Sequence, residues 1–159
     1  MAINETHVVQ LLIKEARLLD ERQFEEWESL FSDDGFYWVP TRPEQESPHS
    51  EVSIFYDDRE LMRRRIERLH HPRIHVDIPP RRTVHLIANI ECTANPANGI
   101  DWMVASNFIM TEYRQGSVRI FSGRYQHKLK VVGGELKIAL KRVDLINCDD
   151  VFEPIVAII

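Results

Sequence analysis

The second half of the chain predicts a meander of long antiparallel strands. After Thr83, strand-like runs rich in apolar and β-branched residues alternate with three short turn segments, NPANG (95–99), RQGS (114–117) and VGGE (132–135). Each segment offers the glycine or asparagine that a tight hairpin needs, because the central residues of such a turn adopt positive φ angles. Consecutive strands joined by short hairpins are therefore expected to form the main sheet.

The N-terminal region predicts two helices. Apolar residues recur at helical spacing from Val9 to Leu19, which predicts a first helix over about Thr6–Leu19. The residues of this helix expected to face solvent are Lys14, Glu15 and Arg17. Asp20 and Gln23 fit a capping box for a second helix, which is expected to stop at the turn SDDG (32–35).

Two strands and a third helix are expected next. The aromatic and β-branched segments FYWVP (36–40) and EVSIFY (51–56) favour strands on either side of a polar, proline-containing loop. Asp58 can cap a third helix. The residues of this helix expected to face inward are Leu61, Met62, Ile66 and Leu69. The segment HHPRIHVDIPP (70–80) then interrupts regular structure with three prolines.

The length, net charge and lack of a long apolar run in the chain favour a single-domain protein that binds neither nucleic acid nor a membrane. The 159 residues fit one domain, 1–159, and a net charge of -5 argues against a nucleic-acid partner. The basic run RRRIER (63–68) is more typical of a solvated helix face or a subunit contact. The N-terminus lacks the plan of a signal peptide, and no apolar run approaches the roughly 18 residues that span a bilayer. We expect a cytoplasmic protein in which Cys92 and Cys148 are free thiols, with no membrane partner.

Two apolar features suggest a partner protein. In the strand expected over Trp102–Tyr113, both alternating sets of side chains contain apolar residues, so both faces of the sheet should be covered. The closing segment INCDDVFEPIVAII (146–159) is also apolar, and a bare apolar strand would promote aggregation. We expect a partner surface to cover it.

Metal, nucleotide and nucleophile motifs are weak or missing in the sequence. A Rieske centre needs two cysteines and two histidines in close pairs, and neither Cys92 nor Cys148 has a histidine within several residues. An iron site built from His75, His85, His127 and an aspartate stays possible, although no spacing selects it. The glycine pair of VVGGEL (131–136) fits a hairpin turn and not a phosphate-binding loop. No metal or cofactor site is therefore assigned to the chain.

General acid–base catalysis is the remaining enzymatic possibility. In RRTVHLIANIE (81–91), alternate positions place His85, Asn89 and Glu91 on one face of a strand. The candidate catalytic residues are Tyr37, His85 and Asn107, with Asp101 as a carboxylate partner. His85 and Asn89 could instead order the sheet or its contact with a partner.

Several stretches of the sequence resemble, in order, a known family. They are VVQLLIKEARLLDERQFEEWESLFSDDGFYWVP, SIFYDDRELMRRRIERL, DIPPRRTVHLIANIE, FSGRYQHKL and LKIALKRVDLIN, and they cover nearly the whole chain. They resemble the small, or beta, subunits of bacterial aromatic-ring-hydroxylating dioxygenases, and the opening is most similar to members that act on aromatic carboxylates such as benzoate, anthranilate and salicylate.

The resemblance implies an α+β fold, the nuclear transport factor 2-like cone, with N-terminal helices on a strongly curved, mainly antiparallel sheet. It also implies a mainly structural subunit, without a cofactor of its own, in an α3β3 hexamer with a beta trimer. The alpha subunit would carry a Rieske [2Fe–2S] cluster and mononuclear Fe(II), supplied with electrons through a reductase or ferredoxin. In that setting the expected subunit-interface residues are Arg81, Arg82, His85 and Asn89. A stand-alone dehydratase or isomerase and a homotrimeric binding module remain the alternatives.

Overall fold

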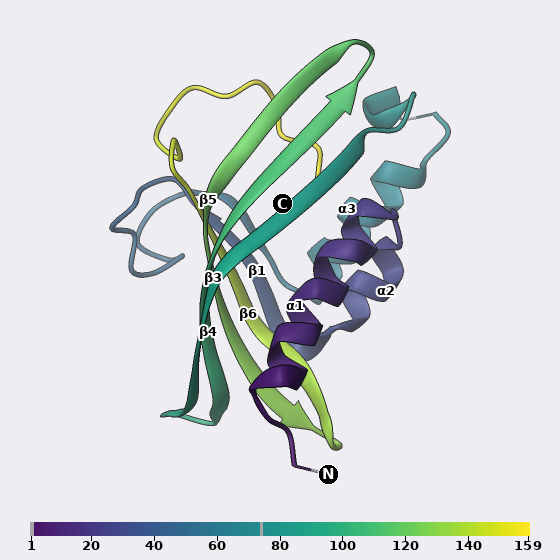
Figure 1. Ribbon diagram of the computed structural model, residues 1–159. Helices are drawn as coiled ribbons and strands as arrows, with labels where there is room; N and C mark the ends of the chain where they lie inside the picture. The colour runs from purple at the N-terminus through teal and green to yellow at the C-terminus, as the bar shows by residue number, and fades with distance from the viewer. Residues whose placement is uncertain (1, 74) are drawn as a thin grey trace.

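Helices and strands occupy separate layers in the computed structural model, which describes residues 2–73 and 75–159 (Figure 1). The fold is α+β, with the helices packed against one face of a six-stranded sheet. The helices are α1 (Glu5–Asp20), α2 (Phe24–Ser29), α3 (Arg59–His70) and the short 3-10 helix η1 (His75–Asp77). The strands are β1 (Phe31–Pro40), β2 (Ser53–Asp57), β3 (Arg82–Ala97), β4 (Ile100–Arg114), β5 (Ser117–Val132) and β6 (Glu135–Leu145).

The sheet has the order β2-β1-β6-β5-β4-β3. All neighbouring strands are antiparallel except β1 and β6, which are parallel, so the sheet is mixed. The predicted meander is confirmed as β3 to β6. Its three hairpins turn at Asn98-Gly99, Gln115-Gly116 and Gly133-Gly134, and all six of these residues have positive φ. The sheet stays open, with β2 and β3 at its edges, and is less curled than the cone that the resemblance implied.

The predicted helix α1 is confirmed, but one of its faces was assigned wrongly. Asn4 caps the helix, since its side chain accepts a hydrogen bond from the backbone N–H of His7. Glu15 was expected to face solvent and is instead 1% exposed. It lies on the same helical face as Val8, Leu12 and Leu19, which pack into the core.

The start of the second helix and its end also differ from the prediction. Asp20 does not cap α2: it is the last residue of α1, and Gln23 occupies the N-cap position without a side-chain hydrogen bond. The segment SDDG (32–35) is not a turn but part of β1, because the strand already pairs with β6 where Phe31 lies opposite Ile138. A long-range strand pairing therefore overrides the local turn propensity of two aspartates and a glycine.

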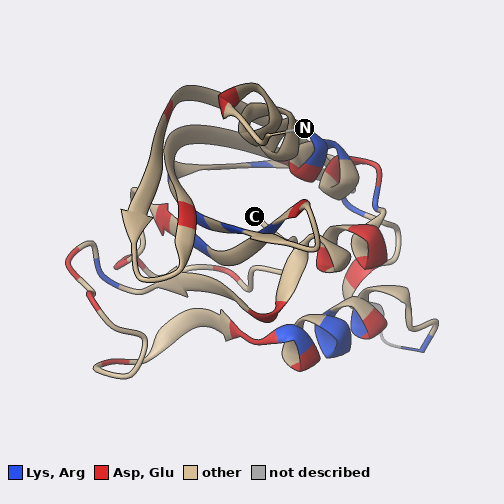
Figure 2. Cartoon of the chain, turned by 90° about the horizontal axis from the view of Figure 1, so that it is seen from below, with Lys and Arg blue, Asp and Glu red and all other residues tan. Residues whose placement is uncertain are grey.

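Helix α3 follows its predicted cap. The carboxylate of Asp58 accepts a hydrogen bond of 2.8 Å from the backbone N–H of Leu61. Met62, Ile66 and Leu69 are buried as expected, whereas Leu61 is 44% exposed, which contradicts its predicted orientation. Figure 2 shows basic and acidic residues side by side along this helix. The basic run is paired within the chain: Arg63 binds Glu28, Arg64 binds Glu60 and Arg65 binds Asp57.

The end of the C-terminal segment is covered by the chain itself. It was expected to need a partner surface, but residues 152–159 fold back without regular structure onto the core. Ile158 and Ile159 are 3% and 0% exposed, and the end of the described chain lies between the sheet and the helices (Figure 1). Burial in the same subunit therefore explains the apolar end of this segment, whereas Ile146 and Val151 remain 76% and 95% exposed.

Candidate functional site

The four residues proposed for acid–base catalysis do not share one site. Tyr37 is buried in β1, where its hydroxyl accepts a hydrogen bond of 3.1 Å from the backbone N–H of Ile159, and burial raises its pKa. Asn107 is exposed on the opposite face of the sheet. The carboxylate of Asp101 accepts a hydrogen bond of 2.7 Å from the backbone N–H of Val131 near the β4–β5 strand ends. His85 lies elsewhere, beside the end of α1.

His85 forms a dyad with Asp20, a partner that sequence reasoning assigned to helix capping. Nδ1 of His85 lies 2.5 Å from one carboxylate oxygen of Asp20, and the other oxygen accepts from the His85 backbone N–H at 2.9 Å. Partial burial alone would raise the pKa of Asp20, but the hydrogen bonds from His85 lower it by a larger amount. The pKa of Asp20 therefore lies below its ordinary value. The side chain of His85 is 1% exposed, and its Nε2 has no hydrogen-bond partner among the described residues. The dyad thus joins the end of α1 to β3.

A second group of polar side chains lies fully inside the core. Glu15 binds Nζ of Lys141 at 2.8 Å and Nε2 of His127 at 2.8 Å, and it accepts a hydrogen bond of 3.1 Å from the indole N–H of Trp27. Nζ of Lys141 also lies 4.5 Å from the ring centre of Tyr125. Sequence reasoning missed this cluster, although the spacing of Glu15 from Val8, Leu12 and Leu19 places it on the apolar face of α1.

The charges in this cluster stabilise one another. Burial raises the pKa of Glu15, but Lys141 and His127 lower it more, so the carboxylate is ionised. Burial lowers the pKa of Lys141, and Glu15 opposes that shift. The cluster ties α1 to β5 and β6 with every member buried. This arrangement anchors a helix to a sheet and offers no open space for a substrate.

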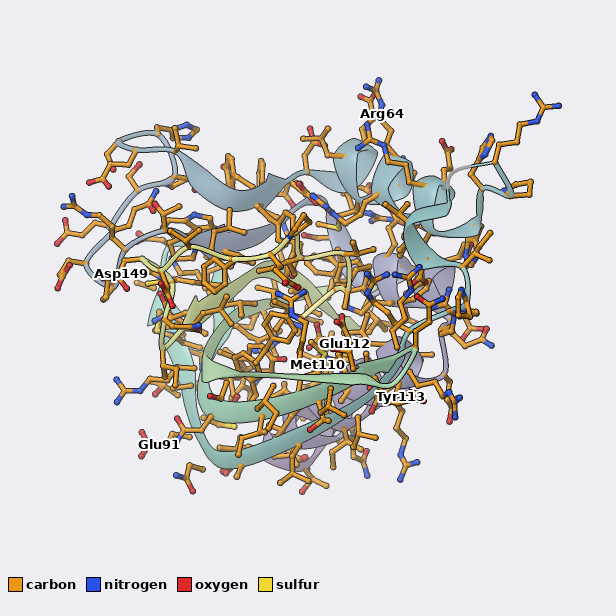
Figure 3. All side chains as sticks on the ribbon, turned by 90° about the horizontal axis from the view of Figure 1, so that it is seen from above. Arg64, Glu91, Met110, Glu112, Tyr113 and Asp149 are labelled. Carbon is orange, nitrogen blue, oxygen red and sulfur yellow. The ribbon has the colours of Figure 1, made fainter. Side chains whose placement is uncertain are left out.

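An open cleft of about 700 Å³ lies at the β4–β5 hairpin end of the sheet. We call it the arginine cleft, and its lining residues include Arg81, Glu112, Arg114, Arg119, Glu153 and Pro154. Glu112 is 3% exposed and lies 3.4 Å from Nε of Arg81 and 3.9 Å from Nη1 of Arg119. In Figure 3, Glu112 points into the molecule while its neighbour Tyr113 lies at the outside. At this end of β4, one face therefore carries the buried charge of Glu112 and the other carries the partly exposed ring of Tyr113.

The outer face of the same strands carries exposed apolar side chains. We call this group the outer apolar patch; it consists of Val84, Leu86, Ile109, Tyr113, Val118 and Ile120. These side chains are 38% to 68% exposed. Leu86 lies opposite Ile109 and Tyr113 opposite Val118, so the patch continues across β3, β4 and β5. A single exposed leucine is ordinary, but a continuous patch of this kind marks a contact surface.

The four expected interface residues occupy different environments. The guanidinium group of Arg81 lies in the arginine cleft, where it also pairs with Asp77 at 2.8 Å. Arg82 lies over the ring of Tyr113, at the edge of the outer apolar patch. Asn89, with φ of 52°, lies at an irregularity of β3 and lines a separate outer groove. The side chain of His85 is internal, so any influence on an interface would act through Asp20 and β3.

The described residues contain neither a cluster of metal-ligating side chains nor a helix suited to span a membrane. Within residues 2–73 and 75–159, no three histidine, cysteine, aspartate or glutamate side chains gather as metal ligands would. The side chain of His75, one member of the possible iron site, lies outside the described part. No helix in the described ranges is both long and apolar enough to cross a membrane.

Comparison with known proteins gives consistent matches. A family model described as "Ring hydroxylating beta subunit" matches residues 14–149. The small oxygenase component of the p-cumate 2,3-dioxygenase system of Pseudomonas putida is 33% identical over 142 residues, covering 88% of this chain and 78% of the relative. The crystal structure of the benzoate 1,2-dioxygenase beta subunit from Burkholderia mallei matches with a TM-score of 0.79 and 26% identity over 99% of both chains. A naphthalene 1,2-dioxygenase structure shares the fold, with a TM-score of 0.77 and 22% identity over 91% of this chain and 81% of that one.

Proposed function

The chain belongs to the family of ring-hydroxylating beta subunits, and from this membership we propose that it assembles with a large, iron-bearing oxygenase subunit. It is the small subunit of a ring-hydroxylating dioxygenase, an oxidoreductase complex. The observation that carries the proposal is the family match over residues 14–149, which extends from within α1 to beyond β6. The large subunit would hold the Rieske [2Fe–2S] cluster and the mononuclear Fe(II), and a reductase or ferredoxin would supply its electrons.

The role of this chain in the complex is mainly structural. Its interior is occupied by packed aromatic and aliphatic side chains, by the Glu15 cluster and by the C-terminal Ile158 and Ile159. Phe108 and Tyr125 are part of this core and stack with ring centres 4.1 Å apart. A subunit packed in this way supplies a rigid surface on which the large subunit can be held.

The substrate of the whole enzyme is an aromatic carboxylate. The p-cumate and benzoate enzymes, whose small subunits are similar to this chain, are named for substrates that carry a carboxylate on an aromatic ring. The complex would add both atoms of O₂ to such a ring. The choice among aromatic carboxylates would be made in the large subunit, where the iron is held.

The assembly is an α3β3 hexamer with a trimer of this chain. The outer apolar patch supports the trimer, because six large apolar side chains on one sheet face of an acidic chain are stabilised when a second copy removes them from water. Arg82 and Asn89 lie on or near that face and remain candidates for the contact.

A second candidate function is acid–base catalysis by this chain alone. The buried Asp20–His85 dyad favours it, because a carboxylate that holds one imidazole nitrogen leaves the other free to accept a proton. The filled interior disfavours it, since Nε2 of His85 is buried and lines none of the clefts described above.

Reconstitution of ring hydroxylation separates the two functions. The chain and the large subunit of the same operon are purified separately and assayed with benzoate, singly and mixed, together with the matching reductase. We expect product only when both subunits are present. If the large subunit forms product equally well with and without this chain, the subunit role is refuted. Dehydratase activity of this chain alone would support the second candidate function.

A further inference from the structure

We infer that the arginine cleft binds a carboxylate-bearing segment of the large oxygenase subunit. This inference rests on the proposed assembly and names the surface through which it forms. The cleft lies where three parts of the chain meet: the start of β3 with η1, the β4–β5 hairpin and the C-terminal segment. An open cleft of about 700 Å³ is large enough to receive several side chains of a partner.

Two arginines of the cleft, Arg114 and Arg119, donate their hydrogen bonds to uncharged backbone carbonyls. Arg114 donates hydrogen bonds to the backbone carbonyls of Pro79 at 3.1 Å and Ile78 at 2.8 Å. Arg119 donates to the carbonyls of Pro154 at 3.0 Å and Glu153 at 3.2 Å. A carbonyl fixes the direction of a guanidinium group without cancelling its charge. Both arginines are thus ordered in advance and keep their positive charge.

The carboxylates of the cleft do not balance its arginines. Glu112 is shared between Arg81 and Arg119, and both distances exceed 3.2 Å. Asp77, behind the cleft, is shared between Arg22 at 2.7 Å and Arg81 at 2.8 Å. Among the lining residues, two carboxylates, Glu112 and Glu153, face three arginines, Arg81, Arg114 and Arg119. The site therefore carries a positive excess on a chain whose net charge is -5.

A protein carboxylate fits this arrangement. Planar guanidinium groups bind carboxylates through paired hydrogen bonds, and arginines that are already ordered lose little side-chain entropy on binding. Val76, Pro154 and Val156 form apolar parts of the wall, against which the aliphatic portion of a glutamate or aspartate segment can pack. Nε of Arg81 and Oε2 of Glu112 lie 3.4 Å apart and neither has a hydrogen-bond partner among the described residues, so this ion pair at the floor of the cleft is loose in the isolated chain.

The position of the cleft favours the large subunit over a second copy of this chain. The outer apolar patch, which we assign to contacts between copies, lies on one face of the β4–β5 hairpin, and the arginine cleft lies on the other. Tyr113 of the patch and Glu112 of the cleft are adjacent residues that point to opposite sides (Figure 3). Copies packed on the outer face therefore leave the cleft available to another partner.

Charge reversal at one arginine of the cleft tests the inference. In Arg114→Glu the lost contacts are two exposed hydrogen bonds, so the fold should persist, which circular dichroism and the melting temperature verify. The matched control is Arg64→Glu on α3, where an exposed arginine that lies at the edge of the molecule, away from Glu112, is reversed (Figure 3). The measured quantity is the Kd between each variant and the purified large subunit, at about 0.05 M and about 0.5 M salt.

At low salt, we expect Arg114→Glu to lose affinity by about tenfold or more and Arg64→Glu to change it by less than about twofold. The affinity of Arg114→Glu should also depend less on salt than the affinity of the unaltered chain does. Equal affinities of Arg114→Glu and the unaltered chain at both salt concentrations would overturn the inference while the assembly stands. An altered oligomer of Arg114→Glu alone would assign the cleft to a second copy and also overturn it. Failure of the unaltered chain to bind would refute the assembly itself.

Discussion

Nζ of Lys141 in β6 lies 2.8 Å from Oε1 of Glu15 in α1, and both side chains are nearly inaccessible to solvent, at 1% and 2% exposed. The pair is the charged centre of the contact between the first helix and the sheet. Removal of one member would leave the other as an uncompensated buried charge, which costs far more than the pair contributes when intact.

Glu15→Gln should therefore destabilise the subunit by about 3–5 kcal/mol, because Lys141 loses its counter-charge while the size of residue 15 is nearly unchanged. Urea unfolding at neutral pH measures the change in the free energy of unfolding. Glu21→Gln, at an exposed position just after α1, is the matched control and should change stability little. Equal midpoints for the two variants would show that the buried ion pair is not important for stability.

Acid should unfold the subunit partly through Glu15. Its pKa in the folded chain is below the ordinary value of 4.5, so the folded state binds fewer protons than the unfolded state in the window between the two values. The stabilisation is present above about pH 4.5 and is lost as pH falls toward the folded-state pKa, by up to about 1.4 kcal/mol per pH unit. Urea midpoints from about pH 6 to about pH 3 should fall less steeply in Glu15→Gln than in the unaltered chain. Parallel curves would contradict this assignment.

The double variant Leu86→Glu/Ile120→Glu should prevent self-association while the fold persists. Both side chains are more than 60% exposed in the isolated subunit, so charges there cost little until a second copy packs against them. Sedimentation velocity should give a trimer for the unaltered chain and a monomer for the variant. Val52→Glu changes a residue that is 83% exposed away from the patch and should leave the trimer intact. A trimeric double variant would move the contact to another surface.

His85→Ala should lower stability without lowering turnover. The variant leaves Asp20 without its imidazole partner, a loss of about 1–3 kcal/mol, but the assembled enzyme should keep its kcat/KM for an aromatic carboxylate within about twofold. The exposed His49→Ala is the control for both readouts. A drop in kcat/KM of about 100-fold or more, with the complex intact, is the scale of a lost general acid or base and would revive the catalytic role of the dyad.

Local signals predicted the parts of the fold that depend on neighbouring residues. Asp58 caps α3 through a contact three residues away, and the glycine and asparagine turns define the hairpins regardless of what packs against them. The turn expected at 32–35 failed because β1 pairs with β6, a partner more than a hundred residues away. Glu15 was misplaced for a related reason, since only its contacts with His127 and Lys141 explain a carboxylate on the apolar face of α1.

The sequence allowed the family to be recognised, but it did not show where the arginine cleft lies or what covers the C-terminal segment. Arg81 was expected at a subunit boundary, and the cleft that contains it could not be foreseen, because Arg114 and Arg119 are ordered by carbonyls of residues 78–79 and 153–154. The C-terminal segment was expected to be covered by a partner because it is apolar, but its last residues pack against the core of the same chain. Apolar composition alone does not distinguish burial in the same subunit from burial against another.

Native mass spectrometry of this chain co-expressed with the large subunit of its operon shows directly whether the two subunits assemble and where the iron is held. We expect a complex containing three copies of each subunit, with iron in the complex and none retained by this chain when it is purified alone. A stable oligomer of this chain that never incorporates the large subunit would refute its role as an oxygenase subunit.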